Sequence, residues 1–249
     1  MSSPAYNRIG LNYSDFRQPD PRIEATIWGA LDDARSVVNV GAGAGSYEPT
    51  DREVIAIEPS PVMIAQRPLG AAPAIEGLAE ALPLADKSID AAMGVLTIHH
   101  WQDLDAGLAE MRRVARRRIV LLTLDAEIAT ETWLVKDYFP EAGSMDRDVM
   151  PSRATIQANL PGAVIEAVPV PSGCLDGFTI ALWDRPELLL DPEVRRASSI
   201  WHRMPPEAAK HGLKRLRAEL ESGRWDEKYG HLRSQAELDI GLRLVRKEL

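Results

Sequence analysis

The sequence predicts an α/β fold: a doubly wound, mostly parallel, seven-stranded sheet of the Rossmann-like kind. Short apolar runs rich in β-branched residues alternate with helical patterns in the first half of the chain, which favours a parallel sheet. The first of these runs, residues 37–40, opens into a loop with three glycines, as in ligand-binding α/β folds. With 249 residues, of which 45% are hydrophobic, the chain is long enough for one such core and an insertion.

Strands are expected where apolar residues run without interruption between glycine, proline or charged residues. Residues 89–98 carry no charge after Asp90, as expected for a strand covered on both faces. Residues 241–246 alternate between apolar and polar side chains, which suits the last strand. The seven expected strands lie at residues 37–40, 54–57, 74–75, 89–98, 119–124, 163–168 and 241–246.

Helices are expected before the first strand and between later ones. Pro21 suits the first turn of an N-terminal helical segment, because a helix start leaves its N–H groups unpaired. Asp103 is placed to cap a helix whose apolar stripe runs from Leu104 to Ala115. The arginines of residues 112–118 are interpreted as the solvated end of that helix, where cations compensate the helix dipole. Further helices are expected at residues 127–139 and 152–160.

The chain is expected to divide into four parts. Residues 171–237 are rich in tryptophan, proline and charge, and leucines at helical spacing indicate helices there. We expect these helices to be inserted before the last strand as a lid over the mouth of the sheet. The expected parts are an N-terminal helical cap (1–34), a ligand-binding core (35–170), a helical lid (171–238) and the last strand of the core (239–249).

Charge and composition exclude several classes of function. The net charge of −8 argues against a nucleic-acid partner, because phosphate contacts require a basic surface. No apolar run approaches the roughly 20 residues that span a bilayer, and nothing resembles a signal peptide, so no membrane partner is expected. Cys174 is the only cysteine, which rules out an intrachain disulfide and fits a cytoplasmic protein.

The glycine loop distinguishes between two kinds of ligand. Gly41, Gly43 and Gly45 are evenly spaced, whereas a dinucleotide-binding loop follows the pattern G-x-G-x-x-G. Only about a turn of helix fits before the next strand begins near Val54, so no long helix can anchor a pyrophosphate. Glu58 at the tip of that strand is placed to bind a ribose diol, a feature shared by both kinds of site.

Four segments in the right order resemble the class I methyltransferases that use S-adenosylmethionine (SAM), specifically the type 11 subgroup. They are the glycine loop, the ribose-binding strand tip, an adenine-side segment, and the fourth strand with its following loop. Their joint spacing is far more specific than any one of them. The segments are residues 38–45, 55–60, 77–84 and 88–101.

The resemblance implies SAM as the cofactor and assigns residues to it. The glycine loop would pass beneath the methionine part, the second strand tip would hold the ribose, and the third segment would face the adenine. Leu78 stands where many relatives carry Asp, so adenine recognition would rest on the main chain or Glu80. Arg17 is a candidate partner for the SAM carboxylate or else a solvated arginine. The implied cofactor-binding residues are Arg17, Gly41, Ala42, Gly43, Glu58, Pro59, Ser60, Leu78, Ala79, Glu80 and Val95.

His99 and His100 are the candidate catalytic residues. A nucleophile that loses a proton is helped by a general base, and histidine near its ordinary pKa suits that task. On an extended backbone the two side chains would point in opposite directions, so one would face the site and the other would pack. The same geometry argues against a shared metal, and no metal is predicted. A packing or loop-ordering role for both histidines stays open.

The expected substrate is a small-molecule methyl acceptor, a flat heterocyclic or aromatic metabolite methylated on N or O. The overall resemblance is to natural-product methyltransferases, with toxoflavin-type azapteridine pathways as one example. A nicotinamide-dependent oxidoreductase and a non-catalytic SAM-binding protein are the alternatives, and the oligomeric state is left open. The candidate substrate-binding residues are Tyr6, Tyr13, Trp133, Asp176 and Phe178.

Overall fold

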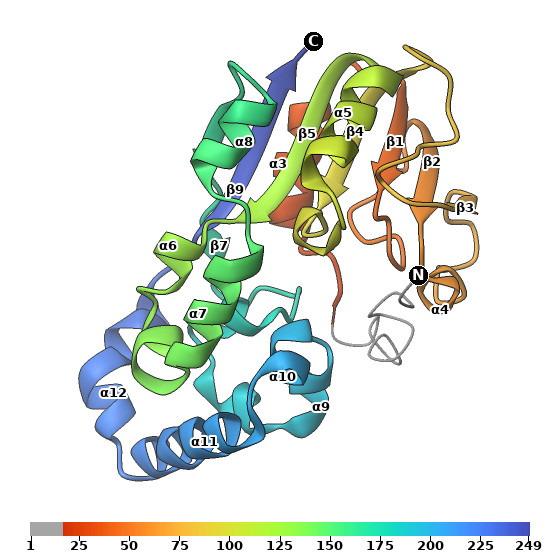
Figure 1. The fold of residues 1–249 in the computed structure, drawn as a ribbon. Helices are drawn as coiled ribbons and strands as arrows, with labels where there is room; N and C mark the ends of the chain where they lie inside the picture. The colour runs from red at the N-terminus through yellow and green to blue at the C-terminus, as the bar shows by residue number, and fades with distance from the viewer. Residues whose placement is uncertain (1–16) are drawn as a thin grey trace.

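The computed structural model describes residues 17–249, and it contains the predicted seven-stranded α/β sheet (Figure 1). The strand order is β3-β2-β1-β4-β5-β9-β6. The first five strands in the chain run parallel, while β9 lies antiparallel between β5 and β6. The strands are β1 (Ser36–Val40), β2 (Glu53–Glu58), β3 (Ala74–Glu76), β4 (Ile89–Val95), β5 (Ala115–Leu124), β6 (Val164–Ala167) and β9 (Leu242–Glu248).

Helices cover both faces of the sheet, and alternate strand residues contact each layer. Val37 of β1 packs in the same cluster as the buried residues of α3 (Pro21–Leu31). Val38 faces the other side, with α5 (Leu104–Val114) and α8 (Arg153–Asn159). Because both faces are covered, the inner strands are almost wholly buried, as their continuous apolar runs predict. Asp20 and Asp103 cap α3 and α5 through their side chains.

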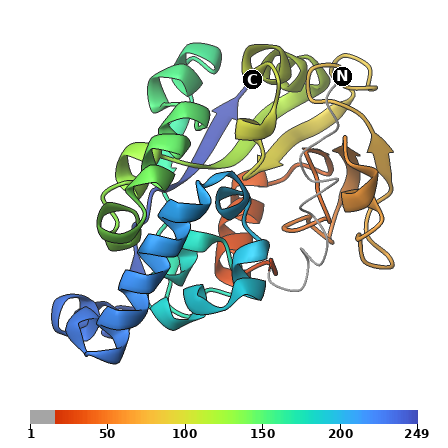
Figure 2. The ribbon, with the colours of Figure 1, turned by 60° about the horizontal axis from the view of Figure 1, so that its bottom comes forward.

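The segment between β6 and β9 is a mostly helical insertion whose two ends pair with each other. β7 (Val170–Pro171) and β8 (Glu237–Leu238) form a separate two-stranded sheet at its base. In Figures 1 and 2 the insertion lies beyond the carboxyl ends of the parallel strands. Its helices are α9 (Pro192–Arg196), α10 (Ser199–Arg203), α11 (Pro206–Glu221) and α12 (Arg224–Tyr229).

The insertion shares a hydrophobic core with the sheet. Trp183 and Trp225 are fully buried in the cluster that also holds α3 and one face of β4 and β5. Trp225 packs edge-on against Trp133, with 5.2 Å between the ring centroids. Gly212 allows α11 to approach closely, because a Cβ there would lie 2.3 Å from the Phe139 ring. The division of the chain into four separate parts stays a prediction.

Two local predictions were wrong. Residues 127–139 do not form one helix: α6 (Ala126–Ala129) is followed by a π-helical turn, η2 (Leu134–Tyr138), and then by α7 (Pro140–Val149). Pro140 disfavours helical backbone at the preceding Phe139, so a new helix begins there. The last three arginines of residues 112–118 belong to β5, where pairing with β4 and β9 prevails over helix continuation. Among residues 17–249, no helix is long and apolar enough to cross a membrane.

Candidate active site

A cavity of about 600 Å³, the first cavity, opens at the carboxyl ends of β1, β2 and β4. The neighbouring parallel strands end side by side here, as expected for an α/β ligand site. It holds nearly all the described residues that the sequence assigns to the cofactor. Its described lining is Arg17, Asn39, Gly41, Ala42, Gly43, Ala44, Ser46, Tyr47, Glu58, Pro59, Met63, Glu76, Gly77, Leu78, Ala79, Glu80, Val95, Leu96, Thr97, His100, Trp101, Gln102 and Asp176.

The glycine loop forms the floor of the first cavity, and Gly41 is its tightest point. The φ angle of Gly41 is +73°, a left-handed conformation that favours glycine. A Cβ at this position would lie 2.0 Å from Oγ1 of Thr97, which follows β4. The N–H groups of Gly41 and Ala42 both donate to the carbonyl of Ile57 in β2. The loop is therefore held between the ends of β2 and β4, the two strands that flank β1.

Three buried polar residues support the glycine loop from below, and sequence reasoning missed them. Glu48 accepts a hydrogen bond from Asn39 Nδ2 at 3.0 Å and pairs with Arg67 at 2.5 Å. The Glu48 and Arg67 side chains are only 7% and 6% exposed. Arg67 also donates to the carbonyl of Gly43 at 3.5 Å. Only Asn39, a polar residue inside an apolar strand, carried a sequence signal.

Glu58 joins the loop to the cavity wall. Its Oε2 accepts a hydrogen bond from Gly43 N at 2.8 Å, and its Oε1 accepts one from Ser60 N at 2.9 Å. Burial raises the pKa of Glu58, partly offset by these backbone N–H groups and by Arg67. Ser60 does not line the cavity: it is fully buried and caps α4 (Pro61–Ile64).

The opposite wall follows β3. Leu78 is 39% exposed at the cavity, and Ala79 lies beside it. Glu80 accepts hydrogen bonds from the backbone N–H groups of Gln102 and Asp103, so its carboxylate orders the chain entering α5. Trp101 completes this wall and packs against Gly107 of α5.

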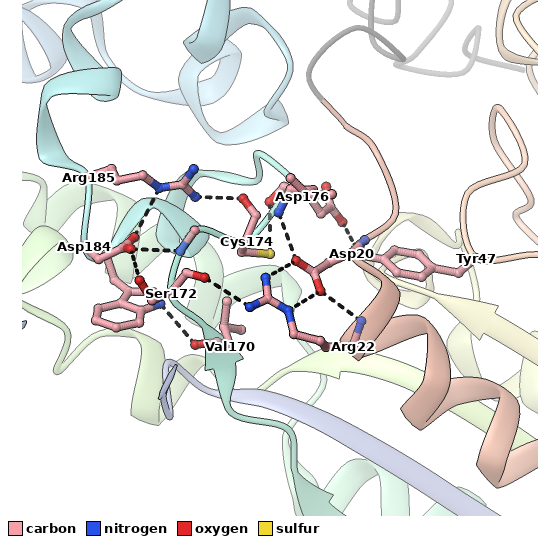
Figure 3. A network of polar contacts seen from close by, with 12 residues as sticks. Asp20, Arg22, Tyr47, Val170, Ser172, Cys174, Asp176, Asp184 and Arg185 are labelled. Atoms are coloured by element: carbon pink, nitrogen blue, oxygen red, sulfur yellow. Dashed lines mark hydrogen bonds and ion pairs between the residues drawn. The ribbon is translucent and has the colours of Figure 1, made fainter. Parts of the chain in front are cut away.

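A buried network ties the start of the described chain to the insertion (Figure 3). Arg17 forms an ion pair with Asp176, which also accepts a hydrogen bond from the Tyr47 hydroxyl at 2.9 Å. Asp20 accepts hydrogen bonds from Arg22 and from Leu175 N. Burial by itself raises the pKa of Asp20, but these hydrogen bonds outweigh it and lower the pKa to about 2. Arg17 and Asp176 are thereby held in the wall of the first cavity.

His99 and His100 lie on a turn of 3-10 helix, η1 (Ile98–His100), and not on extended backbone. The chain turns because Leu96 adopts a φ of +50° and His100 N donates to the carbonyl of Thr97. The rings therefore lie side by side, 3.9 Å between centroids, and do not point in opposite directions. They nevertheless line different cavities, His100 the first and His99 a second one.

Both histidines are held neutral. Burial, followed by the charges of Arg203 and Arg17, lowers the pKa of His100 to about 4. Burial, followed by His100 and the same two arginines, lowers the pKa of His99 well below its ordinary value. The expectation of a histidine near its ordinary pKa is therefore wrong, because a closed site with two cations nearby opposes protonation.

The second cavity has a volume of about 100 Å³ and shares Arg17 and Leu96 with the first. Apolar side chains from η2, α7, α10 and the strand ends form most of its wall. The rest of its described lining is His99, Leu124, Leu134, Val135, Phe139, Ala142, Asp146, Met150, Phe178, Thr179, Ile180, Ser198, Ser199, Ile200, Trp201, Arg203 and Met204.

Known proteins of one family are similar to this chain in sequence and in fold. A family model described as a methyltransferase domain covers residues 38–122. A crystal structure from Anabaena variabilis, of a protein assigned as a methyltransferase from an antibiotic biosynthesis pathway, is 33% identical. It covers 94% of this chain and 99% of its own, with a TM-score of 0.83. The chain belongs to the class I SAM-dependent methyltransferases.

Other relatives match part of the chain or share the fold alone. An uncharacterized methyltransferase of Mycobacterium tuberculosis is 36% identical over 101 residues, which span 37% of this chain and 40% of that protein. A SAM-dependent methyltransferase structure from Thermotoga maritima is 15% identical, with a TM-score of 0.56. It covers 98% of this chain and 97% of its own and shows the same fold.

The first cavity of this methyltransferase fits SAM, its methyl donor. Gly41 has no room for a Cβ because the Thr97 side chain occupies that space, so glycine at this position lets the loop lie at the base of the cavity. The Glu58 carboxylate faces the same space, where hydroxyl groups can donate to it. The size and the hydrogen-bonding groups of the first cavity are thus compatible with this cofactor.

The described candidate substrate-binding residues do not lie together in one site. Asp176 lines the first cavity and Phe178 the second. Trp133 lines neither cavity: it is buried, donates its ring N–H to the Trp183 carbonyl at 3.0 Å and packs against Trp225. Tyr6 and Tyr13 lie outside the described residues.

Acidification is expected to lower the melting temperature of the ligand-free methyltransferase, and less so in a His100→Gln variant. The pKa of His100 is about 4 in the folded protein and 6.5 when unperturbed, so the unfolded chain binds more protons between these values. Stability therefore falls as the pH falls through this window. Asp146, whose pKa burial raises from 3.8 to about 6, acts in the opposite direction in both proteins. Melting curves at about pH 7 and about pH 5 test this; equal drops in both proteins would contradict it.

Proposed function

We propose that this methyltransferase transfers the SAM methyl group to N or O of a small, flat aromatic or heterocyclic metabolite. The observation that carries the proposal is the pair of adjoining cavities. The first suits SAM, and the second is small, mostly apolar and shares Arg17 and Leu96 with it. SAM supplies a methyl group on a sulfonium, so the protein must chiefly hold a nucleophile in line with it. A role in natural-product synthesis is supported by the Anabaena relative.

In this proposal the glycine loop from Gly41 to Gly43 lies beneath the methionine part of SAM, and Glu58 accepts from the ribose hydroxyls. Leu78 and Ala79 pack against the adenine. Arg17, already paired with Asp176, lies where the two cavities adjoin and would orient the SAM carboxylate.

In this proposal the two histidines accept hydrogen bonds and do not act as strong general bases. Each is neutral near pH 7 and can accept a hydrogen bond, but a conjugate acid with a pKa of about 4 takes up a proton poorly. We infer that His99, which lines the second cavity, orients the acceptor by hydrogen bonding, and that His100 lines the cofactor side.

The proposed cofactor is tested by thermal denaturation with S-adenosylhomocysteine, the product form of SAM. At a hundred times its Kd, a ligand specific to the native state adds about 2.7 kcal/mol of stability. A clear rise in melting temperature is expected with S-adenosylhomocysteine and none with NAD, since no long helix follows the glycine loop. The opposite pattern would indicate a nicotinamide-dependent oxidoreductase. Binding without turnover of any acceptor in a broad panel would indicate a non-catalytic SAM-binding protein.

A further inference from the structure

Two residues that line the second cavity carry polar atoms with no hydrogen-bond partner within the described chain. Ser198 is 6% exposed, and its buried Oγ makes no hydrogen bond to residues 17–249. Nδ1 of His99 is likewise buried and without a hydrogen-bond partner in that part of the chain. A buried polar atom left unpaired costs roughly 1–3 kcal/mol. A ligand that forms hydrogen bonds with these two atoms would remove this cost.

Asp146 is a third polar group in this wall. Its Oδ1 accepts a hydrogen bond from Nη2 of Arg203 at 3.3 Å, and its side chain is only 13% exposed. The hydrogen bonds of the described residues leave Oδ2 open to a ligand. Burial raises the pKa of Asp146 to about 6, partly offset by Arg203, so the carboxylate is ionised above that pH.

The charges around the second cavity cancel. Among its described lining residues, Arg203 is paired with Asp146, Arg17 is paired with Asp176, and His99 is neutral. A charged ligand entering this space would lose its hydration without gaining an uncompensated counter-charge, which is costly in an apolar site. The cavity therefore favours an uncharged occupant.

The volume limits the occupant further. At about 100 Å³, the second cavity is smaller than the dry cavity of about 150 Å³ that holds benzene in an engineered protein. The space therefore takes no more than one small ring, and any further part of the molecule must extend past Leu96 toward the first cavity. Phe139, Phe178 and Trp201 supply aromatic walls that suit such a ring.

We propose that the second cavity selects the methyl acceptor as an uncharged ring that donates an N–H or O–H hydrogen bond to Asp146, while Ser198 and His99 pair with its remaining polar atoms. This inference rests on the proposed function for its identification of the occupant as the acceptor. Asp146 and Arg203 act together as the specificity determinant, because each cancels the charge that the other would present to a ligand.

The experiment compares four single-ring probes by fluorine NMR, with the full chain saturated with S-adenosylhomocysteine at about pH 7.5. The probes are para-fluorophenol, para-fluorobenzoate, para-fluorobenzylammonium and fluorobenzene. The phenol is expected to bind about tenfold more tightly than the other three, since it alone is both uncharged and a donor. Equal affinities, or preference for an ion, would overturn the inference.

Three variants make the test specific. Asp146→Asn leaves Arg203 without its counter-charge, so the preference should change from the phenol to the benzoate. Asp148→Asn, an exposed change on the same helix, should leave the order of the probes unchanged. Ser198→Ala should weaken phenol binding several-fold without changing the order, and it should fold normally because this hydroxyl has no partner in the described chain. An unchanged preference in Asp146→Asn would refute the role of Asp146.

Calorimetric titration with S-adenosylhomocysteine separates the two proposals. If the product does not bind, the proposed function fails. If it binds and the probes show no preference, only the inference about the acceptor fails.

Discussion

Replacing Gly41 with alanine is expected to weaken S-adenosylhomocysteine binding by at least about a hundredfold, or 2.7 kcal/mol. The new Cβ would lie 2.0 Å from Thr97 Oγ1 and 2.9 Å from Thr97 Cβ, well inside contact distance. The φ of +73° is also unfavourable for alanine. Thr97 cannot move away easily, because it is buried and packs near Gly94 of β4. The loop must shift instead, and it carries the floor of the first cavity with it.

Gly29→Ala is the matched control for this substitution. Gly29 is an exposed position in α3, and a Cβ there would meet no atom within 4 Å. Alanine in a helix interior is favoured over glycine by roughly 0.5–1 kcal/mol, so this variant should be slightly more stable. Its affinity for S-adenosylhomocysteine should be unchanged by calorimetry. Parent-like affinity in Gly41→Ala would show that the loop does not carry the cofactor.

Replacing Arg67 with methionine is expected to lower the free energy of unfolding by about 3–5 kcal/mol, because it leaves the buried Glu48 carboxylate without its cation. Asn39 still donates one hydrogen bond to Glu48 but supplies no charge. Native proteins are stable by only about 5–15 kcal/mol, so the loss should be conspicuous in urea denaturation. Cofactor affinity should fall as well, because Arg67 also contacts the Gly43 carbonyl.

An exposed ion pair provides the control for the buried one. Lys136 and Glu131 are 61% and 70% exposed, and Lys136→Met should cost less than about 1 kcal/mol. Adding Glu48→Gln to Arg67→Met should recover part of the loss, since no unpaired charge then remains buried. A loss below 1 kcal/mol in the Arg67→Met variant would refute the proposed support of the glycine loop.

The strands were predictable because each interior strand is covered on both faces and must therefore be apolar along its length. That constraint is local and shows in the sequence of β4 and β5. The arginines at the start of β5 broke the pattern. Arg118 is buried, and its charge is compensated by Asp32, Asp33 and Glu248 from two other parts of the chain. Charge compensation by residues far apart in the chain cannot be predicted from the local sequence.

The cofactor side of the site was more predictable than the acceptor side. Gly41 and Glu58, which line the first cavity, carry a strong signal because a glycine loop and an acidic strand tip occur at fixed spacing in ligand-binding α/β folds. Asp146, Ser198 and Arg203 come from the irregular second half of the chain and have no fixed spacing. The ion pair of Asp146 with Arg203 and the unpaired hydroxyl of Ser198 come together only in the folded chain, so no single residue type could have indicated them.

The sequence by itself determined the fold class, because strand burial imposes local rules on residue type, and it indicated the methyl donor through four jointly spaced segments that resemble the SAM-dependent methyltransferases. Tertiary structure alone decided three further features: the buried support of the glycine loop, the neutral state of the two histidines, and the charge-balanced second cavity. Each depends on burial and on partners far apart in the chain, and desolvation energies are properties of the folded arrangement.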